Sequence, residues 1–157
     1  MTPLDHATLP QLLAAYLEAD YRWHAGGQWQ PLRVGAPAPL IEQAYPDAGQ
    51  FGLLSAWNPH SRTRPEIENR RQDAALCQAL ADSDCEFTPA FGSGLNRTWR
   101  EPSWGVLDLP LAQFDALGRH FGQLGTLWWA RGEPVRLRMY AARHECPAHP
   151  CVDWPGA

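Results

Sequence analysis

A short apolar run, FGLLSAW over residues 51–57, is the feature that most limits what this chain can fold into. Its length and its apolar side chains are typical of a buried strand. Asn58 and Pro59 end the run, because a residue before proline stays extended and proline has no N–H for a strand ladder. Pro65 then fits the first turn of a helix. The sequence therefore predicts a strand, a short turn and a helix over residues 51–82.

The following segments can be assigned in the same way, from apolar spacing and from Pro and Gly. The spacing predicts a helix over 65–82, strands over 85–91 and 103–109, a helix over 110–124 and a strand over 126–130. With the first strand, this order is the βαββαβ arrangement of ferredoxin-like folds. We predict an α+β fold with a ferredoxin-like split βαβ core. We expect an antiparallel-rich sheet with both helices on one face.

Additional elements flank this core. They are a helix over 9–20, a hairpin over 21–34 and a C-terminal strand over 135–140. Thr8 and Gln11 have the spacing of a capping box at the start of the first helix. Residues 35–50 and 92–102 are rich in turn-forming residues and are predicted to be loops.

We expect one α+β domain over residues 1–143 and a C-terminal tail over 144–157. The tail holds two His and two Cys within eight residues, namely His144, Cys146, His149 and Cys151. These are zinc-type ligands, but their spacing is tighter than that of a zinc finger. An unliganded tail, a metal site and a disulfide between the two cysteines stay open, although a reducing cell interior disfavours the disulfide. We expect no metal site, and we expect the fold not to require the tail.

Charge and composition argue against several classes of protein. The 157-residue chain has a net charge of −4, and all 13 basic residues are Arg, so it lacks the basic surface of most nucleic-acid binders. No run approaches the ~20 apolar residues of a membrane span, and the first residues lack the pattern of a secretory signal. We expect a cytoplasmic protein that binds neither nucleic acid nor a membrane.

Several short motifs occur in a fixed order along the predicted core. They are Ala56-Trp57-Asn58-Pro59, Glu68-Asn69-Arg70, Glu101 with Ser103, and Phe121-Gly122-Gln123. With these motifs the chain resembles, over roughly residues 51–130, the bacterial family known as domain of unknown function 3293. Trp99 departs from the pattern, because family members often carry His there, which argues against a His–Glu catalytic pair at that point. The resemblance implies no established activity.

The predicted topology brings several polar residues to one end of the sheet. In a split βαβ fold, the turn after the first strand, the loop after the second strand and the end of the second helix lie at the same end. The candidate residues there are Asn58, His60, Glu68, Asn69, Trp99, Glu101, Arg119 and Gln123. We interpret this rim as a binding site for a small polar or anionic ligand, such as a nucleotide. A hydrogen-bonded network that only joins the loops is the alternative.

Three functions therefore stay open. The first is a module that binds a small polar ligand. The second is a hydrolase-like or transferase-like enzyme that uses Glu and His at the same end as general acid and base. The chain has no G-x-S-x-G, H-E-x-x-H or EF-hand motif, and the sequence indicates no particular cofactor. The third is a protein-interaction domain that uses an exposed Trp or an open sheet edge.

Overall fold

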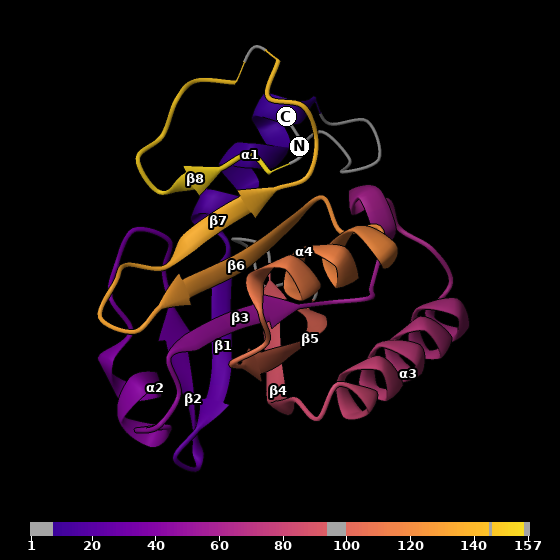
Figure 1. The fold of residues 1–157 in the computed structure, drawn as a ribbon. Helices are drawn as coiled ribbons and strands as arrows, with labels where there is room; N and C mark the ends of the chain where they lie inside the picture. Colours follow the sequence, from indigo (N-terminus) through magenta and orange to yellow (C-terminus); the bar gives the residue numbers. More distant parts are fainter. Residues whose placement is uncertain (1–7, 94–99, 145, 156–157) are drawn as a thin grey trace.

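The computed structural model describes residues 8–93, 100–144 and 146–155 and shows an α+β fold (Figure 1). Within these ranges it contains four α-helices and eight strands in one sheet. The helices are α1 (Leu9–Glu18), α2 (Pro39–Ala44), α3 (Glu66–Asp82) and α4 (Leu111–His120). The strands are β1 (Asp20–Ala25), β2 (Gln28–Leu32), β3 (Gln50–Leu54), β4 (Glu86–Ser93), β5 (Arg100–Leu107), β6 (Gly125–Ala130), β7 (Arg136–Met139) and β8 (Val152–Asp153).

The strand order in the sheet is β2-β1-β4-β5-β3-β6-β7-β8. Neighbouring strands are antiparallel, except that β7 and β8 are parallel, so the prediction of an antiparallel-rich sheet is confirmed. The four strands of the predicted core lie together in the order β4-β5-β3-β6, and α3 and α4 connect β3 to β4 and β5 to β6. The β1–β2 hairpin extends the sheet beyond β4, and β7 extends it beyond β6 (Figure 1).

β3 is buried on both faces, which explains its uninterrupted apolar sequence. Phe51 and Leu53 belong to one hydrophobic cluster, and Leu54 belongs to a second cluster on the opposite face. Gly52 also faces the second cluster. The ring of Phe114 from α4 occupies the place of its missing side chain, because a Cβ on Gly52 would lie 2.2 Å from that ring. A glycine within this strand therefore allows α4 to pack closely against the sheet.

The helices α3 and α4 cover the same face of the sheet, as predicted. Leu76 and Leu80 of α3 share one buried cluster with Phe114 of α4. α1 and α2 contribute to the cluster on the other face. Trp128 and Trp129 pack into different clusters, because neighbouring side chains of a strand point to opposite faces.

One helix was not predicted from the sequence, and another is shorter than predicted. The segment 35–50 is not entirely loop, because α2 begins at Pro39, a residue suited to the first helical turn, and buries Ile41. α4 ends at His120 and does not continue to residue 124. The chain reverses soon afterwards at Gly122, whose φ of 69° is a left-handed conformation that favours glycine.

The hairpin of β4 and β5 is longer than predicted. Residues 92–102 are not a continuous loop, because Ser93 pairs with Arg100 and Gly92 pairs with Glu101 in regular antiparallel register. Glu101 therefore lies in a strand, where the sheet fixes the direction of its side chain.

Within the segment expected to be a tail, residues 152 and 153 belong to the sheet. Val152 begins β8, which pairs with β7, and Cys146 is buried in the hydrophobic core. Asp153 forms an ion pair with Arg136 at 2.8 Å. Whether the domain needs this segment to unfold cooperatively stays a prediction.

Candidate functional site

The chain leaves β3 through a turn with unusual backbone geometry. Asn58, His60 and Ser61 have φ values of 47°, 56° and 60°, a region that residues other than glycine rarely adopt. Asn69 of α3 holds the turn in place. Its side-chain oxygen accepts the N–H of Asn58 at 2.9 Å and Nε–H of Arg64 at 2.6 Å. Its amide nitrogen donates to Oδ1 of Asn58 at 2.9 Å and to the carbonyl of Arg64 at 3.4 Å, so its hydrogen-bonding capacity is used.

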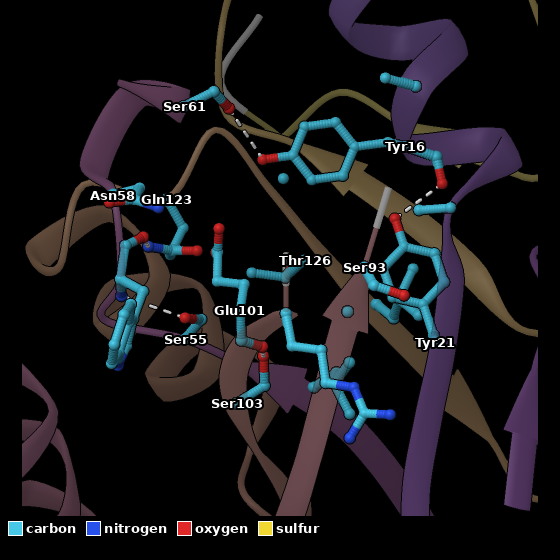
Figure 2. A pocket seen from close by; sticks show the side chains of 18 of the residues that line it. Tyr16, Tyr21, Ser55, Asn58, Ser61, Ser93, Glu101, Ser103, Gln123 and Thr126 are labelled. Carbon is cyan, nitrogen blue, oxygen red and sulfur yellow. Dashed lines mark hydrogen bonds between the residues drawn. The ribbon is translucent and has the colours of Figure 1, made fainter. Parts of the chain in front are cut away.

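A cavity of about 590 Å³ lies where this turn, α1 and the β4–β5 hairpin meet (Figure 2). Leu12, Leu53 and Leu127 form apolar parts of its wall. Most buried polar side chains among the described residues also line it, namely Ser55, Asn69, Ser93, Ser103, Gln123 and Thr126. Buried polar side chains around an open volume are typical of a small-molecule site.

The carboxyl group of Glu101 points into this cavity (Figure 2). Burial raises the pKa of Glu101 from 4.5 to about 7. Hydrogen bonds from Ser55 and Asn58 to the carboxyl group lower its pKa, but burial has the larger effect on the pKa. Both protonation states of Glu101 are therefore populated near neutral pH.

Two tyrosines border the cavity on the side of α1 and β1. The hydroxyl of Tyr16 lies 3.2 Å from Oγ of Ser61, and the hydroxyl of Tyr21 donates to the carbonyl of Tyr16 at 2.6 Å (Figure 2). Burial, together with the nearby charge of Glu101, raises the pKa of Tyr16 to about 12. Burial also raises the pKa of Tyr21 well above 10.0. Both phenols are therefore neutral at physiological pH.

A buried polar network supports the cavity wall at Thr126. Its Oγ1 lies 2.9 Å from the hydroxyl of Tyr140, which donates to Asp115 at 2.8 Å. Asp115 also accepts two bonds from the guanidinium of Arg138, at 2.8 and 2.6 Å. Because the single hydroxyl proton of Tyr140 goes to Asp115, Thr126 donates its own proton to Tyr140. The hydroxyl of Thr126 therefore points to the α4 side of the sheet, away from the face that carries Leu127.

Four of the residues predicted from sequence line the cavity. They are Asn58 in the turn, Asn69 on α3, Glu101 on β5 and Gln123 after α4. Gln123 donates from Nε2 to the carbonyl of Trp57 at 3.1 Å, which ties the segment after α4 to the turn. The structure thus brings together segments far apart in sequence, as the topology led us to expect. The role of these residues in binding stays a prediction.

Two other predicted residues do not line the cavity. Glu68 is exposed on α3, because one residue step along a helix turns its side chain away from the face that carries Asn69. His60 is exposed, and its backbone N–H donates to the carbonyl of Gly122 at 2.6 Å. The cavity that contains Glu101 therefore lacks the His partner of the expected Glu–His pair among the described residues.

Arg119 was expected one helical turn before Gln123, but α4 ends between them and the helical spacing does not apply. Arg119 is not among the residues that line the cavity. Its guanidinium instead lies over the ring of Tyr140, 5.2 Å from the centroid, and donates to the carbonyl of Pro155 at 2.9 Å. Trp99, the remaining predicted residue, lies outside the described residues.

Sequence reasoning missed several cavity residues. They are Tyr16, Tyr21 and Thr126, which belong to α1, β1 and β6. The capping box of Thr8 and Gln11 is present and marks the start of α1. It carries no information about where the helix packs, so no signal in the sequence placed α1 beside the turn.

The His and Cys residues of the C-terminal segment do not converge on one point. His144 and His149 are exposed, Cys146 is buried and Cys151 is half-buried. The two cysteines are free thiols, so the disulfide alternative is absent from this structure. Across the part of the chain that the structure describes, no group of three or more His, Cys, Asp or Glu residues is arranged to hold a metal ion.

Residues 54–125 match the model of a family described as a protein of unknown function (DUF3293). This match confirms the resemblance carried by the motifs around Asn58, Glu101 and Gln123, over a somewhat shorter stretch than residues 51–130. No curated protein and no solved structure matches the chain.

No helix in the described ranges combines the length and apolar character needed to cross a membrane.

Proposed function

We propose that the cavity at Glu101 binds a small polar ligand. The supporting observation is a volume of about 590 Å³, within the usual range for small-molecule sites, around which buried polar side chains gather. A buried carboxyl group with a pKa of about 7 lowers the stability of the fold when it ionises. Ionisable groups whose pKa is shifted in this way, at the expense of stability, are characteristic of binding and catalytic sites.

General acid–base catalysis is a second function, favoured by the pKa of about 7 at Glu101. A carboxyl group with this pKa can accept and donate a proton at neutral pH. Because His60 lies outside the cavity, such an enzyme would use Glu101 without a His partner from the turn. The neutral hydroxyl of Tyr16 borders the same space and is the neighbouring group suited to polarise a substrate.

A protein-interaction role receives less support. Trp29, Leu40 and Ile67 are the large apolar side chains most exposed among the described residues. They lie on β2, α2 and α3, so they belong to three different elements. Single exposed apolar residues are common on soluble proteins and do not mark a partner surface.

The finer fold class and the location of the protein are also proposals. The antiparallel order β4-β5-β3-β6, with a helix before β4 and another before β6, supports a ferredoxin-like split βαβ core. Four free thiols support a reducing, cytoplasmic environment. The net charge of −4 supports a protein that does not bind nucleic acid.

A thermal-shift screen of the purified protein against small polar metabolites tests the binding proposal. A ligand at one hundred times its Kd should add ~2.7 kcal/mol to the free energy of unfolding. The matched variant is Ala15→Trp, which places a large ring at an exposed α1 position on the cavity wall. We expect this variant to keep its stability and to lose the ligand-induced shift. An equal shift in the variant would contradict binding in the cavity.

A further inference from the structure

Two hydroxyls that line the cavity near Glu101 have already used their protons within the protein. Tyr21 uses its hydroxyl proton on the carbonyl of Tyr16 at 2.6 Å, so its oxygen can only accept another bond. Ser103 donates to the carbonyl of Glu101 at 3.2 Å. Lone pairs of these hydroxyls therefore accompany the carboxylate in the cavity.

The cationic side chains that line the cavity are engaged elsewhere. Arg64 donates from Nε to Asn69 at 2.6 Å and from a terminal nitrogen to a backbone carbonyl at 2.6 Å. The guanidinium of Arg100 lies over the ring of Phe91, 4.5 Å from its centroid. In the described ranges, no Arg or His forms an ion pair with Glu101. The carboxylate thus lacks a cationic partner from this part of the chain.

We propose that the ligand carries a primary ammonium group, which binds the carboxylate of Glu101. This inference rests on the proposed binding function and names its ligand class. An ammonium group has three donors and no acceptor, which matches the lone pairs of Glu101, Tyr21 and Ser103. An anionic group would instead meet the carboxylate and the same lone pairs. Leu12 and Leu53 provide an apolar wall for the carbon skeleton of such a ligand.

Binding of an ammonium group has a second consequence, the release of protons. Near neutral pH part of the protein carries a protonated Glu101, because its pKa is about 7. A bound cation favours the carboxylate, so this proton leaves on binding. The other ionisable side chains lining the cavity are Tyr16, Tyr21, Arg64, Arg100 and Glu66. The tyrosines stay neutral at this pH, and Glu66 lies in an exposed pair with Arg70.

The test compares three probes of nearly equal size, n-pentylammonium, n-pentanol and n-pentanoate. Each is titrated into the full-length protein at about pH 8, above the pKa of about 7 at Glu101. The side-chain amide signals of Asn58 and Gln123 are followed by NMR. The variant Glu101→Gln removes the charge and keeps the shape. Glu68→Gln is the matched control, because it removes an exposed carboxylate outside the cavity.

We expect n-pentylammonium to bind at least roughly tenfold more tightly than n-pentanol, the ratio that corresponds to one charge-assisted hydrogen bond. Glu101→Gln should abolish this preference, whereas Glu68→Gln should retain it. Calorimetry near pH 7 in buffers of different ionisation enthalpy should show proton release with the wild type and none with Glu101→Gln. Equal binding of n-pentylammonium and n-pentanol, or tighter binding of n-pentanoate, would overturn the ammonium class and leave the binding site intact. Absence of binding by all three probes would overturn both proposals.

Discussion

Replacing Glu101 by Gln should make the protein more stable above neutral pH. Gln has the shape of protonated Glu and cannot ionise, so the variant measures how much the charge lowers the free energy of unfolding. Burial raises the pKa of Glu101 from 4.5 to about 7. One pKa unit corresponds to about 1.4 kcal/mol, so the ionised carboxylate lowers the free energy of unfolding by about 3 kcal/mol.

The raised pKa also sets the direction of the pH dependence. Folded Glu101 holds its proton more tightly than the unfolded chain does, so the folded state binds more protons between pH 4.5 and about 7. Stability therefore falls as the pH rises through this window. Below it, wild type and Glu101→Gln should have similar stability. Above it, the variant should be more stable by about 3 kcal/mol.

Urea unfolding followed by tryptophan fluorescence, at about pH 4.5 and about pH 8, measures both differences. Comparison of two variants at each pH cancels the titration of all other groups. Glu68→Gln serves as the control, since it removes an exposed carboxylate on α3 and should leave the pH dependence unchanged. A Glu101→Gln variant that is less stable than wild type at about pH 8 would refute the reasoning, because the carboxylate would then stabilise the fold.

Three further changes test the framework around the cavity by urea unfolding. Asn69→Ala should lower the free energy of unfolding by about 3 kcal/mol, because it leaves buried donors and acceptors of the turn without partners; a loss below about 1 kcal/mol would contradict its role in holding the turn. Asp115→Ala should cost about 3 kcal/mol, because it removes the carboxylate that accepts two bonds from the buried Arg138 and leaves that guanidinium only Asp153 at 3.5 Å; an unchanged midpoint would argue against the ion pair with Asp115. Truncation after Arg143 should cost about 2–4 kcal/mol, since Cys146 and Val152 are buried, and a broad, non-cooperative transition would show that the domain requires the segment.

The order of the elements could be predicted because residues at each boundary determine where a strand or helix begins and ends. The run from Phe51 ends at Asn58-Pro59, and the helix that follows begins after Pro65. The packing could not be predicted in the same way. The glycine at position 52 is explained only by the position of α4. The ring of Phe114 fills the space beside it, and this residue lies 62 positions further along the chain. Contacts of this kind depend on the tertiary structure and leave no periodic signal.

The candidate site was predictable only where topology determines position. Asn58 and Glu101 could be placed together, because strand order and direction bring the turn after β3 and the hairpin after β4 to one end. Arg119 was placed wrongly, because the prediction extended α4 beyond the point where the chain reverses at Gly122. Tyr16 was missed, because docking of α1 on the cavity depends on shape and not on strand order.

Structural support and the proposed binding role fall to different residues of this cavity. Asn69 is 2% exposed and uses all its donors and acceptors on the turn, so it has nothing left to offer a ligand. Glu101 is the opposite case, because its charge is opposed by burial and has no cationic partner in the described ranges. Asn58 connects the two, since Asn69 fixes its oxygen while its side chain lies beside the carboxyl group of Glu101. A fully bonded support therefore holds one buried acid that has no cationic partner in the described ranges, which is the arrangement that the proposed ligand site requires.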